Sequence, residues 1–217
     1  MLSLTGPEFI PAGKIKNIVI LLHGLGSNGD DLMGLVPMMS SVLPNTAFLA
    51  PNAPLPTPFS ASGYQWFEYW DRTMMQINDG IQNAAPMIVD YIEEAVKRFK
   101  VPHANVVLCG FSQGCMMALH TGLRLVEDIG GVIGLSGVLM SPETLVMEKV
   151  TKLPPVLLAH GLQDTVVPAL ASYQAEIVLK SLGVDVKYIQ RPYMGHSIDD
   201  QVIKASIEFC QKIFKQV

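Results

Sequence analysis

Short apolar runs recur along this chain of 217 residues and predict the strands of a buried sheet. Four of them are almost continuously apolar, and they cover residues 15–22, 106–109, 132–135 and 156–159. Strands that are apolar on both faces belong to a mostly parallel sheet with helices on each side. Two further strands are predicted over residues 46–49 and 184–190.

Apolar residues spaced three and four apart predict helices between these strands. The helices are expected over 88–99, over 115–126, between Pro168 and Gly183, and over 203–214. Pro86 marks the start of the first helix or a kink in it, because proline lacks the N–H that a helix interior requires. The alternation of strands and helices, without a repeat or a linker, predicts a single α/β domain over residues 1–217.

Composition and charge exclude several classes of function. The chain has 15 Lys and Arg residues against 19 Asp and Glu residues, a net charge of −4, so no basic patch for nucleic acid is expected. A hydrophobic share of 49% excludes a disordered chain. The longest uncharged stretches, 32–67 and 104–123, are interrupted by prolines or polar residues, so we expect no integral membrane association.

The cysteines and the first residues indicate the compartment. The three cysteines cannot all pair with one another, and none stands in a C-x-x-C motif. The chain begins without the basic segment and long apolar segment of a secretory signal. These features predict a reduced, cytoplasmic protein.

The sharpest chemical signal is the segment 110–114, Gly-Phe-Ser-Gln-Gly, which fits G-x-S-x-G. It stands between a predicted strand and a predicted helix, where this motif turns a serine hydroxyl clear of the backbone for nucleophilic attack. The alternative is a glycine-rich turn with a structural or phosphate-binding role. The context favours Ser112 as a nucleophile.

A nucleophilic serine requires a base, and the base requires an acid that orients it. In this arrangement they follow in the order serine, acid, histidine. Asp164 follows a buried strand within a short loop, and His196 is the only histidine after it. Taken singly, Asp164 is more often explained as a helix cap and His196 as a loop histidine. Their joint order and placement predict the triad Ser112, Asp164 and His196.

Acyl transfer also requires two N–H groups directed at the developing oxyanion. Gln113, the residue after the nucleophile, is expected to supply one of them. Leu25, in the glycine-rich turn 23–26, is expected to supply the other. The alternative for this turn is a purely structural role, and His23 is expected to tie the loop down by hydrogen bonds.

Four segments together resemble the phospholipase/carboxylesterase family, which includes the acyl-protein thioesterases. They are residues 23–26, 110–114, 160–168 and 194–196. The resemblance spans about residues 15–214 and implies an α/β-hydrolase fold without a large cap domain. It also implies hydrolysis of carboxylic esters and thioesters without a cofactor. Residues 63–68 resemble the aromatic segment of the bacterial branch of this family.

The substrate site is less sharply defined by the sequence. Residues 51–70 combine several prolines with six aromatic residues, which either form an apolar rim over the serine or pin a long loop to the body. Leu55, Trp66, Phe67 and Val167 are assigned to this site. The expected substrate is a small-molecule or lipid acyl ester or thioester, or an acylated protein. Exposure of the aromatic residues would favour a homodimer.

Other classes of function are weighed against this one. The sequence has no H-E-x-x-H or Cys/His cluster, so no metal is expected. A serine peptidase could use the same triad, although amide hydrolysis in this fold usually requires an additional cap domain, for which 217 residues leave little room. A non-catalytic binding protein would predict the loss of a triad residue or of a glycine turn, and neither is lost.

Overall fold

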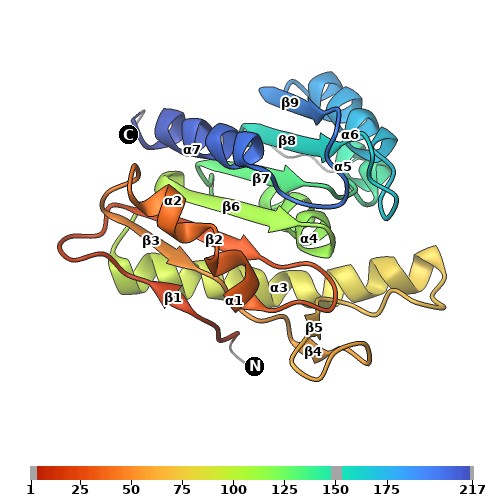
Figure 1. Ribbon diagram of the computed structural model, residues 1–217, viewed down its shortest axis with the longest axis horizontal. Helices are drawn as coiled ribbons and strands as arrows, with labels where there is room; N and C mark the ends of the chain where they lie inside the picture. The colour runs from red at the N-terminus through yellow and green to blue at the C-terminus, as the bar shows by residue number, and fades with distance from the viewer. Residues whose placement is uncertain (1–3, 148–152, 216–217) are drawn as a thin grey trace.

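The computed structural model describes residues 4–147 and 153–215, and its centre is a seven-stranded sheet (Figure 1). The strands are β1 (Glu8–Phe9), β2 (Asn17–Leu22), β3 (Thr46–Leu49), β6 (Val106–Phe111), β7 (Gly131–Leu135), β8 (Val156–Gly161) and β9 (Val186–Arg191). Their order is β1-β3-β2-β6-β7-β8-β9, and every neighbouring pair is parallel except β1 with β3. The predicted mostly parallel sheet is therefore confirmed.

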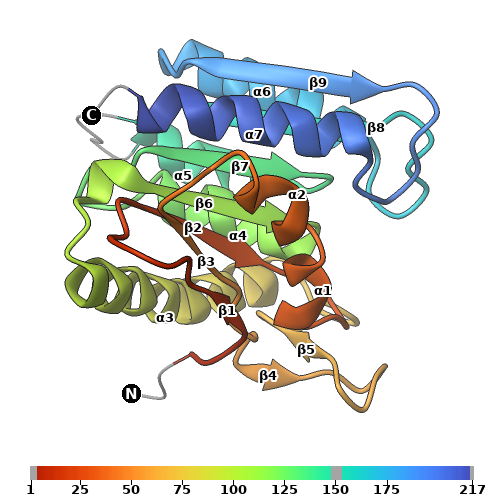
Figure 2. The same ribbon diagram turned by 60° about the vertical axis from the view of Figure 1, so that its left-hand side comes forward.

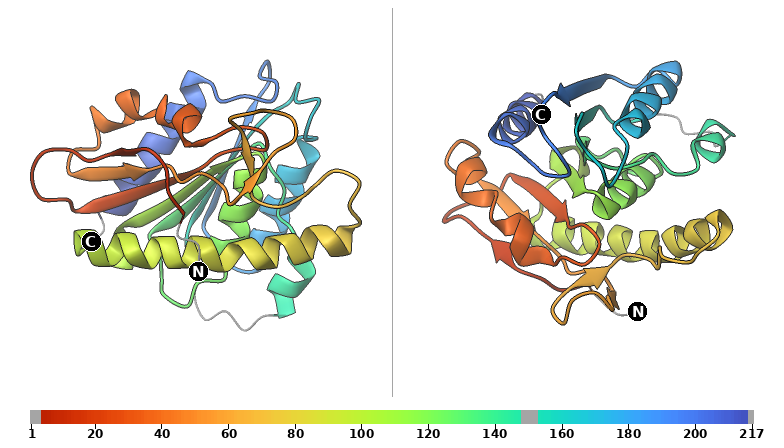
Figure 3. Two further views of the ribbon diagram at one scale, coloured as in Figure 1. Left: turned by 90° about the horizontal axis from the view of Figure 1, so that it is seen from below. Right: turned by 45° about the vertical axis from the view of Figure 1, so that its right-hand side comes forward.

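Helices cover both faces of the sheet (Figures 2 and 3). One face carries α3 (Met74–Phe99), α4 (Gln113–Gly122) and α6 (Leu170–Ser181), and the other carries α1 (Gly29–Met33), α2 (Val36–Ser40) and α7 (Asp200–Phe214). In β2, Ile18 and Ile20 pack toward the first group, whereas Val19 and Leu21 pack toward the second. This alternation explains why the central strands are apolar at every position. A short helix, α5 (Pro142–Met147), follows β7.

The register of the sheet brings four loops to one edge. Leu22 at the end of β2 pairs with Gly110 near the end of β6, and Gly161 at the end of β8 pairs with Arg191 at the end of β9. The loops that follow β2, β6, β8 and β9 therefore begin side by side. In open α/β sheets this carboxyl edge is where ligands bind.

The helix expected over 88–99 begins much earlier in the structure. α3 is 26 residues long and includes Pro86, so of the two alternatives left open by the sequence, a helix start at Pro86 is wrong. A capping box explains the start, because Thr73 Oγ1 accepts from the Gln76 N–H and the Gln76 side chain accepts from the Thr73 N–H. Buried residues on both sides of Pro86, such as Ile81 and Ile88, stabilise the helix through the proline.

The predicted loop over residues 51–70 contains a small antiparallel hairpin. It is formed by β4 (Leu55–Pro56) and β5 (Tyr64–Gln65), and the loop then leads directly into α3 (Figure 1). Among the residues that the structure describes, no helix combines the length and the apolar character needed to cross a membrane.

Candidate active site

Ser112 occupies a sharp turn between β6 and α4. Its backbone has φ 55° and ψ −116°, a conformation that non-glycine residues seldom adopt. The flanking glycines are required by space, because a Cβ at Gly114 would lie 2.0 Å from Leu22 O and one at Gly110 would lie 2.0 Å from Gly114 O. The G-x-S-x-G segment thus forms a tight elbow with the serine at its tip.

The structure joins the three predicted triad residues in one chain of hydrogen bonds. His196 Nε2 lies 2.9 Å from Ser112 Oγ, and His196 Nδ1 lies 2.7 Å from Asp164 Oδ2. The serine follows β6, the aspartate follows β8 and the histidine follows β9. The carboxyl edge of the parallel sheet thus brings together side chains that are up to 84 residues apart.

The side chain of Asp164 has no exposed surface, and it accepts hydrogen bonds on both carboxylate oxygens. Its Oδ1 accepts from the Val166 N–H at 2.8 Å and the Val167 N–H at 2.9 Å. Burial raises the pKa of this carboxyl group, but the hydrogen bonds from His196 and the two backbone N–H groups outweigh it and leave the pKa below its ordinary value. Asp164 therefore binds a turn before α6 and contacts His196, whereas the N-cap of α6 is Ala169, so the alternative that Asp164 caps this helix is wrong.

A second histidine contacts Asp164 from the inner side. His160 is fully buried, and its Nε2 lies 3.1 Å from Asp164 Oδ2 and 2.9 Å from Val167 O. Its Nδ1 lies 2.7 Å from Ser172 Oγ. This contact was not predicted from the sequence, although the spacing of four residues between the end of β8 and the loop after it was available as a signal.

Leu25 lies in the loop after β2, beside the serine. A Cβ at Gly24 would lie 3.3 Å from Ser112 Cβ, which measures how closely this loop approaches the elbow. The Gly26 N–H donates to Tyr64 O at 2.9 Å and the Ser27 N–H donates to Gly24 O at 3.2 Å, so hydrogen bonds hold the loop on the C-terminal side of Leu25. Gln113 is the first residue of α4, where helix N–H groups point outward to an anion.

The Gln113 side chain connects the elbow to the aromatic segment, a role that the sequence analysis missed. Its Oε1 accepts from the Trp66 N–H at 2.8 Å, and its Nε2 donates to Phe67 O at 2.8 Å. The Trp66 indole N–H in turn donates to His23 O at 2.9 Å. These bonds link the residue after the nucleophile to the glycine-rich turn through a buried tryptophan.

His23 ties its loop down, as expected from its position at the end of a strand. Its Nδ1 donates to Gly24 O at 2.8 Å, and its Nε2 accepts from the Ala53 N–H at 3.0 Å. Both bonds are satisfied by one neutral tautomer. Burial lowers the pKa of His23, which favours this neutral form.

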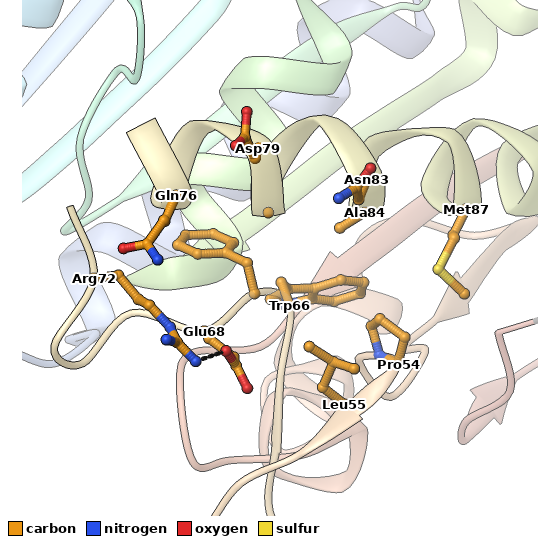
Figure 4. A pocket seen from close by; sticks show the side chains of 12 residues that line it. Pro54, Leu55, Trp66, Glu68, Arg72, Gln76, Asp79, Asn83, Ala84 and Met87 are labelled. Atoms are coloured by element: carbon orange, nitrogen blue, oxygen red, sulfur yellow. Dashed lines mark hydrogen bonds and ion pairs between the residues drawn. The ribbon is translucent and has the colours of Figure 1, made fainter. Parts of the chain in front are cut away.

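A cavity of about 650 Å³ lies between the aromatic segment and α3 (Figure 4). Leu55, Trp66 and Phe67, three of the four residues assigned to the substrate site, line it together with α3 side chains such as Met87. Val167 does not line this cavity, because it lies beside Asp164, to which its N–H donates. The Glu68–Arg72 ion pair borders the cavity.

The aromatic residues of the segment 51–70 divide into two groups. Trp66 and Phe67 are each 1% exposed and belong to the core, whereas Phe59 and Trp70 are each 60% exposed. Phe59 and Trp70 contact each other edge to face with ring centroids 5.8 Å apart. Trp66 and Phe67 thus pin the segment to the body of the protein, whereas Phe59 and Trp70 form an exposed aromatic pair.

The cysteines are buried, and burial raises the pKa of their thiols. For Cys109 the pKa rises to about 12, and those of Cys115 and Cys210 are also raised. None of the three is therefore suited to act as a thiolate. Within the described parts of the chain, no group of three or more His, Cys, Asp and Glu side chains is placed to hold a metal ion.

Comparisons with known proteins agree with this geometry. A family model described as Phospholipase/Carboxylesterase matches residues 9–214. Acyl-protein thioesterase 1 of Debaryomyces hansenii is 26% identical over 231 residues, covering 96% of this chain and 99% of that protein. Acyl-protein thioesterase 1 of Aspergillus fumigatus is 30% identical, with coverages of 95% and 92%.

Solved structures give the same result. The crystal structure of esterase PE8 superposes with a TM-score of 0.92 at 36% identity, and the match covers 98% of this chain and 100% of that chain. The predicted α/β-hydrolase fold without a large cap domain is confirmed. The narrower likeness of residues 63–68 to a bacterial branch is not borne out, since the two thioesterases named above are fungal.

Proposed function

We propose that this chain, which belongs to the phospholipase/carboxylesterase family and is a hydrolase of the carboxylesterase and thioesterase class, acts through Ser112, His196 and Asp164. The observation that carries the proposal is the continuous path of hydrogen bonds from Ser112 Oγ through both ring nitrogens of His196 to Asp164. Nucleophilic acyl transfer requires a serine whose hydroxyl proton can pass to an adjacent, oriented base.

In the first half of the reaction, Ser112 Oγ attacks the acyl carbonyl carbon and its proton passes to His196 Nε2. The imidazolium then donates this proton to the departing alkoxide or thiolate, leaving the acyl group on the serine. In the second half, water attacks the acyl-enzyme, and His196 takes a proton from the water and returns one to Ser112. Asp164 accepts from His196 Nδ1, which orients the ring and stabilises its positive charge.

The oxyanion of each tetrahedral intermediate is assigned to the N–H groups of Leu25 and Gln113. The position of Gln113 at the start of α4 and the close approach of the Gly24 loop to Ser112 support this assignment. The buried bonds of the Gln113 side chain hold the same residue in place.

The acyl chain is assigned to the cavity bounded by Leu55, Trp66 and Phe67. A volume of about 650 Å³ lies in the range of sites that bury small ligands. Ser112 and His196 do not line the cavity, so the acyl chain would leave the serine along the aromatic segment to reach it. The expected substrates are acyl esters and thioesters, in line with the acyl-protein thioesterase and esterase names of the relatives.

The test is hydrolysis of p-nitrophenyl esters from acetate to palmitate, with palmitoyl-CoA as the thioester, by the wild type and by Ser112→Ala. We expect the substitution to abolish turnover of every substrate, because the remaining triad residues have no nucleophile to activate. Ser181→Ala, which removes an exposed hydroxyl on α6, is the matched control and should hydrolyse all substrates at the wild-type rate. A folded wild type no faster than Ser112→Ala on any substrate would instead favour a binding protein.

A further inference from the structure

We propose that His160 is a positioning residue of the active site, which donates a second imidazole N–H to Asp164 and thereby fixes the carboxylate that orients His196. This inference rests on the proposed function, because it assigns to His160 a part in the same hydrogen-bonded chain. It adds His160 to the triad as a fourth side chain. In this arrangement His160 is a fixed donor, and His196 is the histidine that exchanges protons.

The proton on His160 is placed by what its Nε2 faces. Val167 O lies 2.9 Å away and Asp164 Oδ2 lies 3.1 Å away. A carbonyl oxygen and an ionised carboxylate are both acceptors only. His160 Nε2 must therefore carry a proton, which it shares between the two oxygens.

The other ring nitrogen of His160 faces a hydroxyl group. Ser172 Oγ lies 2.7 Å from His160 Nδ1, and Ser172 is 2% exposed. With Nε2 protonated and the ring neutral, Nδ1 is an acceptor, and the Ser172 hydroxyl donates to it at 2.7 Å in preference to Gly137 O, which lies 3.4 Å from Ser172 Oγ. Ser172 thus partners the tautomer of His160 that donates to Asp164, and both ring nitrogens are satisfied.

The result for Asp164 is a carboxylate held by four donors. Two backbone N–H groups bind Oδ1, and two imidazole N–H groups bind Oδ2. The side chain of Asp164 has no exposed surface, so no water is available to replace a lost donor from outside. Rotation of the carboxylate would break bonds at both oxygens at once, and Oδ2 is therefore kept in the direction that His196 needs.

The two imidazoles on Oδ2 differ in access. The side chain of His196 is 17% exposed and contacts Ser112, whereas that of His160 is fully buried and contacts only groups of the protein interior. His196 can therefore exchange its proton with a leaving group or with water. His160 has no such route, so it acts through Asp164 and does not touch substrate.

The variant test compares His160→Met with His160→Gln. Methionine removes the donor with little change in volume, whereas a glutamine amide N–H can reach the position of Nε2. We expect His160→Met to lower kcat by about 10-fold or more with KM for p-nitrophenyl acetate nearly unchanged, because the loss falls on the transition state. His160→Gln should recover most of this loss. His103→Met and His103→Gln, at a histidine paired with Glu93 far from the serine, are matched controls expected to equal the wild type.

A spectroscopic test begins with the wild type, whose result alone can overturn the inference. In ¹⁵N-histidine-labelled wild type, the resonances of His160 should show a proton on Nε2 and none on Nδ1. The proton that His196 Nδ1 shares with Asp164 should resonate far downfield, and its shift should change in His160→Met but not in His103→Met. A proton found on Nδ1 of His160 in place of Nε2 would overturn the inference.

Two kinetic results would also overturn it. One is a kcat of His160→Met equal to that of the wild type, and the other is an equal loss in the methionine and glutamine variants, which would indicate a packing role. Failure of the proposed function has a different signature, since the wild type itself would then show no ester or thioester hydrolysis above Ser112→Ala.

Discussion

The carboxyl edge of the sheet and the cavity beside α3 differ in how their polar groups are held. At the edge, Asp164, His160 and His196 have their hydrogen-bonding groups matched to named partners. Around the cavity six apolar side chains stand beside five polar or charged ones, and the Glu68–Arg72 pair among the latter is partly exposed.

The difference separates two tasks that an acyl hydrolase must perform. The proton transfer proposed at Ser112 would depend on distances fixed to a few tenths of an ångström, which buried and fully partnered groups provide. Accommodation of an acyl chain depends on volume and apolar surface, which tolerate variation. We therefore expect substitutions at the edge to change the rate for all substrates, and substitutions at the cavity to change the ranking of substrates.

Asp164→Asn gives the largest expected effect within this comparison. The amide keeps the size of the side chain but removes the charge and changes which His196 tautomer is favoured, so kcat should fall by about 10³- to 10⁴-fold. Steady-state kinetics with p-nitrophenyl acetate measure this. Asp185→Asn, at an exposed aspartate paired with Lys212, is the control expected to leave kcat unchanged. Turnover within a few-fold of wild type would place the orienting acid elsewhere.

Gln113→Ala tests whether the edge and the cavity wall are mechanically joined. The substitution leaves the Gln113 backbone N–H in place but removes both side-chain bonds to Trp66 and Phe67. Each buried backbone group that is left without a partner costs about 1 to 3 kcal/mol. We expect kcat/KM to fall by about 10-fold and the unfolding temperature to fall with it.

The control for Gln113→Ala is Gln211→Ala. In the wild type, the Gln211 side chain donates to Val42 O at the surface. It should leave both the kinetics and the unfolding temperature at wild-type values. If Gln113→Ala lowers stability alone, the side chain serves the fold and not the oxyanion site.

Met87→Trp tests the cavity side of the comparison. The larger ring should fill the space beside Trp66 and shorten the acyl chain that the cavity accepts. When two methylene groups of the acyl chain can no longer be buried, kcat/KM should fall by about 10-fold. The expected result is a lower kcat/KM for p-nitrophenyl palmitate with acetate unchanged. Met38→Trp, at an exposed methionine on α2, should leave the chain-length profile as it is. An equal loss on acetate and palmitate would remove the cavity from the acyl site.

The smallest expected effect concerns a buried histidine that lacks the partners found at the edge. Among the described residues, His120 Nδ1 has no hydrogen-bond partner. Burial and the charge of Arg124 lower the pKa of His120 to about 4. The folded state therefore holds His120 neutral, while in the unfolded state it gains a proton below its ordinary pKa of 6.5.

The stability that His120 contributes should therefore be complete above pH 6.5 and be lost as the pH falls from 6.5 to about 4. Urea unfolding between pH 7 and pH 4 should show a smaller decline for His120→Leu than for the wild type. His103→Leu, at a partly exposed histidine, serves as the control. Identical declines in wild type and His120→Leu would contradict the assignment.

The sequence predicted most of the parallel sheet and the meeting of Ser112, Asp164 and His196 at its edge, because both depend on local patterns. The run 106–109 is apolar enough to be a central strand, and Gly110 and Gly114 have spacing that only a tight turn explains. Asp164 and His196 each follow a strand, and a parallel sheet collects such positions at one edge.

Features that depend on tertiary contacts were missed. The long extent of α3 depends on the capping box at Thr73 and on packing across Pro86, which outweighs the propensity of proline to break a helix. The Gln113 side chain bonds to Phe67 and Trp66, which lie 46 and 47 positions before it in the sequence, so no local pattern indicates these bonds. The two exposed residues of β1 have no apolar run that would mark them as a strand.

The burial of all three thiols has a practical consequence for assays. Cys109, Cys115 and Cys210 have at most 4% of their surface exposed, so colorimetric thiol reagents have almost no access to them while the protein stays folded. Coenzyme A or a peptide cysteine released from a thioester would then be the only thiol that reacts quickly. Thioester cleavage can thus be followed continuously by the colour that the released thiol forms with the reagent, with almost no contribution from the protein's own thiols. A slow late rise in colour would indicate unfolding of the protein instead of turnover.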